Sequence, residues 1–348
     1  MLRSCGWSLA LSAVLVVGCK RGDSAAEATA VNDAGTPPTP SRAAPPTQPS
    51  EPRAPATRVG VGPGEAERRD VALGREGDDP FLRPFATKVR EHFKDTKSRA
   101  PLEVQRASLL GGGAATLVRR AGETFPLLIV EDRERRLLWE RDKPTISMTP
   151  PVRDPVVVGR AQGGVAIFVY DVPAKVLAGR FLDADGTPFA DLNVIASEDC
   201  QAVSAAHWPG RGIVGACVRS GGARLQLVRN DNTLAWPREG VPLATTFRAP
   251  GPLAIAPDTD ASMMVVHYGT IQGADHLVAQ RFDERGAALW PSEKDLGEVP
   301  HLEHPEERVA VTSLGTGVRI ALAHGLAKDP GARVLDVSPD GEAAAHAQ

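Results

Sequence analysis

Short apolar runs separated by tight turns make up most of the chain after residue 100. In the clearest example, the apolar run 277–282 leads into a turn that begins at Asp283 and reaches Gly286, and Trp290 follows. An Asp at the first position of a turn bonds to its own backbone, and a Gly at the fourth supplies the positive φ that closes a bulged hairpin. The pattern therefore predicts a strand, a tight turn and a second strand.

Weaker copies of this pattern recur along two thirds of the sequence. One copy runs from Asp183 to Gly186, and others start at residues 132, 229 and 338. Their fourth positions hold Arg135, Asn232 and Gly341. Asn tolerates the positive φ that the turn needs, whereas Arg departs from the rule. The five turns indicate a repeat protein.

The repeat length favours one architecture. The turns start about 50 residues apart, a second predicted hairpin precedes each of them, and each unit offers about four short strands. We therefore predict an all-β fold, a small β-propeller of about five four-stranded blades over residues 101–348. A β-sandwich with degenerate hairpins is the alternative. Because the last unit lacks a full final strand, residues 101–107 are the candidate to close the ring.

Large aromatic residues follow most of these turns: Trp139, Phe189, Trp236 and Trp290. Packing between blades requires one large apolar group per unit. The three tryptophans are therefore predicted to be packing wedges between blades and not ligand platforms.

The motif also resembles a known repeat. Gln280-Arg281-x-Asp283-x-x-Gly286 with Leu289-Trp290 is similar to the repeats of secreted bacterial β-propellers, and Trp236 followed by Gly-Val-Pro-Leu at 240–243 matches their next segment. The resemblance covers roughly residues 100–348 and implies architecture, not activity. The chain is similar more loosely to quinoprotein-type propellers, whose docking tryptophan lies four residues after a Gly; their Asp lies one residue further back.

The N-terminus predicts export and anchoring. Residues 1–18 combine Arg3 with an apolar run too short to span a membrane, as in a signal peptide. The segment ending at Cys19 resembles the bacterial lipobox, which implies lipidation of Cys19 and a membrane anchor; an ordinary signal peptide with a chance Cys is the alternative. Lys20, in place of the Asp that retains lipoproteins in the inner membrane, favours the outer membrane.

Residues 19–64 are rich in Pro, Ala, Ser and Thr, and we expect a disordered tether because such a segment buries too little apolar surface to fold. Residues 65–100 read as a linker with one short amphipathic helix over 84–94, since Phe85, Val89 and Phe93 fall on one helical face. The helix is predicted to pack on the propeller; a partner-binding or membrane-surface helix is the alternative.

The composition disfavours two classes of binding partner, nucleic acids and carbohydrates. The formal net charge of −3 gives no electrostatic case for nucleic acid, and an aromatic content of 5% disfavours a carbohydrate platform. Cys5 leaves with the signal peptide, so Cys200 and Cys217 remain after lipidation of Cys19. In an exported protein we expect them to form a disulfide across one hairpin, directly opposite or one diagonal apart; two buried free thiols are the alternative.

No catalytic, cofactor or metal motif satisfies its spacing rules. His301 and His304 lie three apart between prolines, where a helical zinc site needs four, so a solvated loop is predicted with metal binding as the alternative. At Asp183–Asp185 and at Asp258–Asp260 we predict simple turns, with calcium binding as the alternative. No cofactor is predicted, and an enzymatic role stays uncertain and disfavoured.

These features predict a lipid-anchored, non-catalytic propeller that binds a protein partner or serves as a scaffold in the bacterial cell envelope. Function concentrates on loops of a rigid scaffold, and the less repetitive loops here are 142–155, 245–252 and 292–305. Two alternatives are kept. One is an enzyme or ligand-binding propeller with a central-channel site. The other is an outer-membrane protein assembly factor. The lipoprotein of this kind that acts in β-barrel insertion has eight blades, so the five units found here count against this alternative.

Overall fold

The computed structural model describes residues 67–72, 74–94, 100–120, 126–142, 152–161, 163–243, 253–299, 309–324 and 331–346. The signal segment, Cys19 and the predicted tether lie outside this part of the chain. So do His301, His304 and most of the three loops that the sequence favours for binding. All described residues belong to one compact unit, residues 57–348.

The unit is a β-propeller of five antiparallel sheets, which we call blades 1 to 5 in chain order. Blade 1 consists of β1 (Glu67–Val71), β2 (Leu102–Ser108), β3 (Ala114–Arg120), β4 (Leu127–Glu131) and β5 (Leu137–Asp142). Blade 2 consists of β6 (Val152–Gly159), β7 (Val165–Asp171), β8 (Val176–Leu182) and β9 (Pro188–Ala196). Blade 3 consists of β10 (Ala202–Trp208), β11 (Gly212–Arg219), β12 (Gly222–Arg229) and β13 (Val241–Leu243).

Blade 4 consists of β14 (Leu253–Thr259), β15 (Ser262–Ile271), β16 (Ala274–Asp283) and β17 (Lys294–Glu298). Blade 5 consists of β18 (Val309–Ser313), β19 (Val318–His324), β20 (Gly331–Val337) and β21 (Ala343–His346). Each blade is a meander in which consecutive strands pair, so the predicted all-β propeller of five blades is confirmed.

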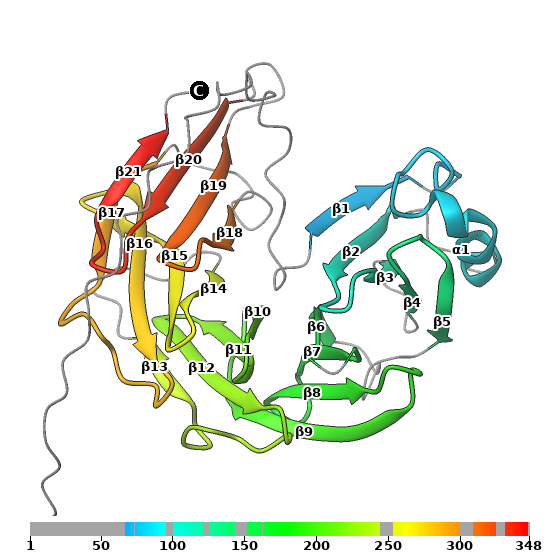
Figure 1. The fold of residues 1–348 in the computed structure, drawn as a ribbon, viewed down its shortest axis with the longest axis horizontal. Helices are drawn as coiled ribbons and strands as arrows, with labels where there is room; N and C mark the ends of the chain where they lie inside the picture. The colour runs from blue at the N-terminus through cyan, green and yellow to red at the C-terminus, as the bar shows by residue number, and fades with distance from the viewer. Residues whose placement is uncertain are drawn as a thin grey trace, which may run out of the picture. The chain divides into compact units, whose positions relative to one another are not determined.

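The blades follow one another in a curved row, with blade 1 and blade 5 at its ends (Figure 1). Inner strands of neighbouring blades pack together: β2 on β6, β6 on β10, β10 on β14, and β14 on β18. This order places residues of successive blades side by side and fixes which turns become neighbours.

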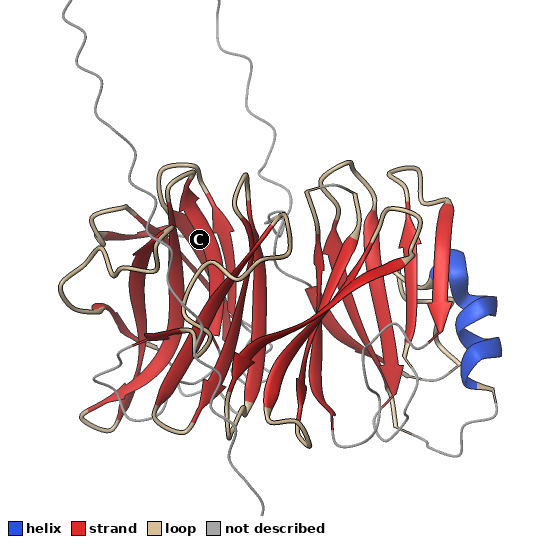
Figure 2. Ribbon diagram, turned by 90° about the horizontal axis from the view of Figure 1, so that it is seen from below, coloured by secondary structure: helices blue, strands red, loops and turns tan. Residues whose placement is uncertain are grey.

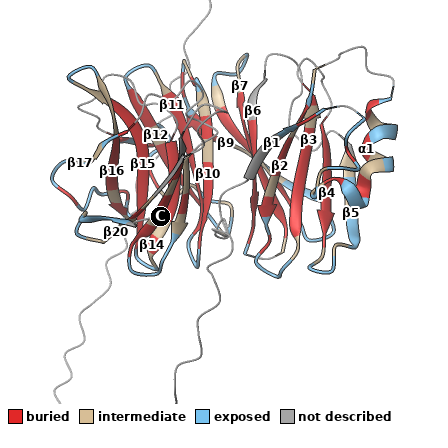
Figure 3. Ribbon diagram, turned by 90° about the horizontal axis from the view of Figure 1, so that it is seen from above, coloured by how far each residue is buried: buried red, intermediate tan, exposed pale blue. Residues whose placement is uncertain are grey.

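Alternating residues of one strand serve two different interfaces. On β15, Met263 and Val265 join the apolar cluster that contains Trp208 of blade 3, whereas Met264 and Val266 join the cluster that contains Val318 of blade 5. Successive side chains of a strand point to opposite faces of the sheet, so a strand covered on both faces is apolar at every position. Figure 3 shows the result: the inner strands of the blades are buried along most of their length, and exposure concentrates in turns, on the outer strand β5 and on the outer side of α1.

A helical segment covers the outer face of blade 1 (Figure 2). The 3₁₀ helix η1 (Arg83–Phe85) leads into α1 (Ala86–Phe93), and their buried residues Phe85, Val89 and Phe93 cluster with residues of β2 to β4. The predicted helical face is therefore confirmed, and it packs on the propeller. In a closed ring this face of blade 1 would meet blade 5; among the described residues it meets the helix instead.

Two expectations differ from the structure at the ends of the row. β1 lies in the stretch that we took as linker, yet it pairs with β2 and gives blade 1 a fifth strand. Residues 101–107 do not complete blade 5, because they form β2 inside blade 1 and β21 supplies the fourth strand of blade 5. β1 is short and polar, and β21 is short and alanine-rich, so neither strand shows the apolar pattern that predicted the other strands.

Candidate functional site

The five predicted turns have the same backbone conformation. In each, the N–H of the fourth residue donates to the carbonyl of the first, and the N–H of the first donates to the carbonyl of the fifth. The fourth residue has positive φ in every copy: Arg135 (66°), Gly186 (80°), Asn232 (64°), Gly286 (78°) and Gly341 (84°). These turns lie at one end of the blades, together with the β2–β3, β6–β7, β10–β11, β14–β15 and β18–β19 turns, because alternate turns of a meander lie at the same end. We call this end the turn face.

At three of the four junctions between neighbouring blades, a repeated tryptophan connects its blade to the turn of the next one. The indole Nε1 of Trp139 donates to Ala184 O at 2.6 Å, that of Trp236 to Glu284 O at 3.0 Å, and that of Trp290 to Pro339 O at 2.9 Å. In all three cases the acceptor is the second residue of the next turn. The indole rings of Trp139 and Trp236 also lie against Gly186 and Gly286, where a Cβ would come within 2.7 and 3.1 Å of the ring atoms.

Asp183 and Asp283 occupy the first positions of two of these turns. The Asp283 carboxylate accepts hydrogen bonds from the backbone N–H groups of Arg285 and Ala287 at 2.9 and 2.8 Å. In the other turn, Asp185 bonds the N–H of Thr187 at 2.8 Å, and hydrogen bonds from Thr187 lower the pKa of Asp185. The carboxylates of Asp283 and Asp185 therefore act on their own turns.

Blade 2 meets blade 3 without a tryptophan. Ala190 stands where the tryptophan would, because it pairs with Phe181 as Trp139 pairs with Val130; the aromatic residue, Phe189, lies one position earlier and has no side-chain N–H to donate. Arg160 supplies the polar contact: its guanidinium lies 4.5 Å from the centre of the Phe189 ring, and its Nη2 donates to Asn232 Oδ1 in the next turn at 3.3 Å. Burial lowers the pKa of the Arg160 guanidinium, while the charge of Asp183 opposes that effect. The sequence reasoning missed Arg160 because no local motif marks it.

Two buried glutamines support the tryptophan segments from within their own blades. Gln226 accepts from Trp236 N at 3.0 Å and donates to Pro237 O at 2.8 Å. Gln280, in the equivalent place, donates to Trp290 O at 3.4 Å. The glutamine of the repeat motif therefore positions the tryptophan backbone.

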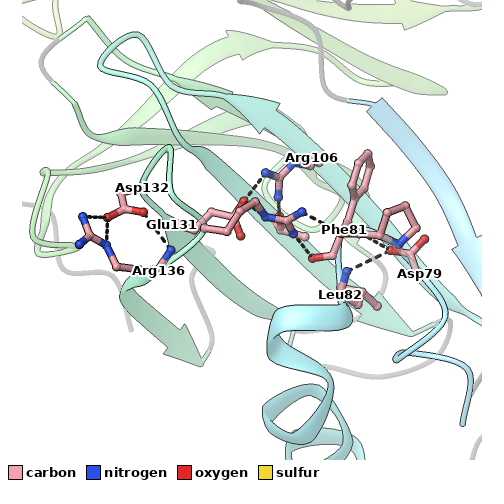
Figure 4. A network of polar contacts seen from close by, with 10 residues as sticks. Asp79, Phe81, Leu82, Arg106, Glu131, Asp132 and Arg136 are labelled. Atoms are coloured by element: carbon pink, nitrogen blue, oxygen red, sulfur yellow. Dashed lines mark hydrogen bonds and ion pairs between the residues drawn. The ribbon is translucent and has the colours of Figure 1, made fainter. Parts of the chain in front are cut away.

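A polar network attaches the helical segment to blade 1, and Figure 4 labels Phe81, Arg106 and Glu131 among its members. Arg135, the exceptional residue at a fourth turn position, also belongs to this network. The fully buried Glu131 carboxylate forms ion pairs with Arg106 and, at 2.8 Å, with Arg135. The Arg135 guanidinium also donates to Pro80 O at 2.9 Å and to Phe81 O at 3.0 Å. These bonds give a reason for an Arg at a positive-φ position, which costs roughly 1–2 kcal/mol for a non-glycine residue.

The predicted disulfide between Cys200 and Cys217 is confirmed, with a Cα–Cα distance of 5.4 Å. Its placement differs from both registers that we considered. Cys217 faces Val203 across the β10–β11 pair, and Cys200 lies in the loop before β10. The hairpin loop has three residues, 209–211, and not two or four, because Trp208 pairs with Gly212.

Buried ionisable side chains are distributed among the blades. Asp258 pairs with Arg281 at 2.5 Å, and His267 pairs with Glu293 at 3.0 Å, both in blade 4. His207 of blade 3 is 2% exposed, and its ring nitrogens have no hydrogen-bond partner among the described residues. Burial lowers the pKa of the His207 imidazole. Within the described ranges no three His, Cys, Asp or Glu side chains gather in a way that suits a metal ion.

A cavity of about 450 Å³ opens on the turn face between blades 3 and 4. The β10–β11 turn contributes Gly210 and Arg211, the end of β12 contributes Arg229, and the β16–β17 turn contributes Glu284 and Arg285. Leu227 and Ala235 complete the lining. The Trp236–Glu284 hydrogen bond joins the two blades beside this cavity, so the contact that repeats between blades also fixes the geometry of its walls.

Comparisons with known proteins add little to this description. No protein-family model and no curated protein sequence matches the chain. The structure is similar to the WD40 domain of Neurospora crassa Pan2, with a TM-score of 0.34 and 12% identity over 70% of this chain and 74% of that one. It is also similar to puromycin hydrolase, with a TM-score of 0.33 and 13% identity over 80% of this chain and 44% of that one. At these scores the similarities support no functional argument, and the chain spans less than half of the hydrolase.

Proposed function

We propose that this protein is a membrane-anchored lipoprotein that presents a non-catalytic β-propeller as a protein-binding or scaffold module in the bacterial cell envelope. The observation that supports the proposal is the repeated contact from Trp139, Trp236 and Trp290 to the next blade. It makes neighbouring blades one scaffold, and turns and loops held on such a scaffold are suited to recognise a partner.

The buried polar side chains support the same role. Glu131, Gln226, Gln280 and Asp258 all make contacts that hold strands, turns or the helical segment in place. Among the described residues no helix is long and apolar enough to cross a membrane. We assign membrane attachment to Cys19, whose acyl chains would bury methylenes at about 0.8 kcal/mol each.

Anchoring is tested with Cys19→Ala in a bacterial host. We expect the variant to lose incorporation of labelled palmitate and to move from the membrane fraction to the soluble fraction. Cys5→Ala is the matched control, because that residue leaves with the predicted signal peptide. A Cys19→Ala protein that still takes up the label would contradict the assignment.

Partner binding is tested by photo-crosslinking in intact envelopes. A crosslinking residue replaces Ser292, in one of the loops favoured by the sequence, or Pro209, an exposed residue of the β10–β11 turn on the turn face; Arg90 on the outer side of α1 is the control position, with a side chain 62% exposed. We expect a discrete adduct from at least one of the first two positions and none from the third. Absence of adducts at both would count against a protein-binding module.

A further inference from the structure

The cavity between blades 3 and 4 has a charge opposite to that of the whole chain. Three arginines and one glutamate line it, which gives a formal sum of +2, whereas the chain carries −3. Arg211 pairs with Glu284 across the two blades, so one positive charge is already matched. No hydrogen bond or ion pair joins the guanidinium group of Arg229 or Arg285 to another described residue. Hydrogen bonds from Thr233 and the charge of Arg229 lower the pKa of Asp231, so one carboxylate lies near Arg229 without pairing with it.

The walls are held in place before any ligand arrives. Arg211 Nε donates to Asp260 O of blade 4 at 3.4 Å, in addition to its ion pair with Glu284. On the other side, Trp236 Nε1 bonds the Glu284 carbonyl. A site whose walls are fixed in the free protein loses less entropy on binding than one that must order first.

The chemistry of the lining selects an anion with some apolar character. Two guanidinium groups recognise carboxylates by paired N–H donors, and Leu227 with Ala235 gives the lining an apolar part. Glutamate side chains combine both features, because a short aliphatic stem carries the carboxylate.

We propose that this cavity binds an acidic, glutamate-containing segment of a partner protein, with Arg229 and Arg285 as the carboxylate-binding residues. The proposal rests on the protein-binding role proposed above and names the chemistry of the partner. It also assigns Glu284 a negative role in affinity, because its carboxylate occupies Arg211 and repels the ligand.

The test measures the fluorescence anisotropy of labelled hexaglutamate as it binds the full chain. We expect Arg229→Gln/Arg285→Gln to bind about 10-fold more weakly, and Glu284→Gln to bind about 3-fold more tightly, since an exposed charge pair changes an affinity by roughly that much. Binding by the unsubstituted chain should weaken with salt, because exposed charges are screened. Arg133→Gln, an exposed turn-face arginine of blade 1, is the matched control and should change nothing.

Glu284→Gln keeps the test independent of folding defects, because damage to the structure does not raise affinity. Equal hexaglutamate affinity in the unsubstituted chain and the double-arginine variant would overturn the proposal. Binding of inorganic phosphate, measured by calorimetry, without binding of hexaglutamate would overturn the acidic-peptide assignment and identify a phosphate site.

The two proposals fail separately. If hexaglutamate binds as expected while no envelope adduct forms, Arg229 and Arg285 remain a carboxylate-binding site, but the protein-binding role fails and with it the assignment of a protein partner. If adducts form equally with the double-arginine variant and hexaglutamate does not bind, the role stands and the cavity assignment fails.

Discussion

Replacement of Trp236 by Phe tests whether the indole N–H holds blades 3 and 4 together. Trp236 is 5% exposed, and its Nε1 lies 3.0 Å from the Glu284 carbonyl oxygen. A Phe at this position keeps an aromatic ring but has no N–H to donate. The substitution therefore removes one inter-blade hydrogen bond and part of the ring.

The expected cost separates into two parts. A neutral hydrogen bond contributes about 0.5–1.5 kcal/mol, and the smaller ring adds a packing loss. Trp208→Phe in the same blade is the matched control, because Trp208 is 1% exposed and its Nε1 has no hydrogen-bond partner among the described residues. Both variants lose the same ring volume, so Trp236→Phe should cost about 1 kcal/mol more than Trp208→Phe.

The assay is urea unfolding of the full chain followed by circular dichroism, with unchanged slopes as the condition for comparing midpoints. Trp236→Ala removes the whole wedge and should cost about 3–5 kcal/mol. The reasoning is refuted if Trp208→Phe is as costly as Trp236→Phe, or if Trp236→Ala costs less than about 1 kcal/mol.

Three further predictions use the same unfolding measurement. Glu131→Gln should cost roughly 2–3 kcal/mol, because two partly buried arginines lose their counter-ion; the exposed Glu134→Gln is its control, and equal effects of the two would contradict the network. Cys200→Ala/Cys217→Ala should cost about 3 kcal/mol by the loop-entropy model, and no loss would show that the bond does not restrain the unfolded chain. Burial lowers the pKa of His207, so the unfolded state binds more protons and stability should fall as pH drops below the ordinary histidine pKa of about 6.5. His207→Leu should remove that part of the pH dependence, and an unchanged pH profile would contradict it.

The turns show which structural features the local sequence can predict. Asp283 and Gly286 encode one turn within four residues, and the same rule found Asp183 and Gly186. It also found the degenerate copy at Arg135, although an Arg breaks the expected composition. The reason for that Arg lies in its bonds to Pro80 and Phe81, more than fifty residues away in the chain. No local rule contains this information.

The disulfide shows that local sequence also fails to place a contact between two residues only 17 positions apart. Two cysteines in an exported chain predict a bond, but its place depends on the hairpin loop between them. The three-residue loop 209–211 shifts the register, so Cys217 faces Val203 and Cys200 reaches it from outside the strand. A loop shorter or longer by one residue would move every pair of the hairpin.

The sequence by itself determined the repeat, the five blades, the tryptophan positions and the helical face, because each depends on residues within one strand, turn or helical turn. Tertiary structure alone decided which carbonyl each indole meets, the substitution of Arg160 for a missing tryptophan, and the helix that covers blade 1. It also brought Arg211, Arg229 and Arg285 to one cavity. These contacts join different blades or distant segments, and their geometry exists only once the sheets have packed against one another.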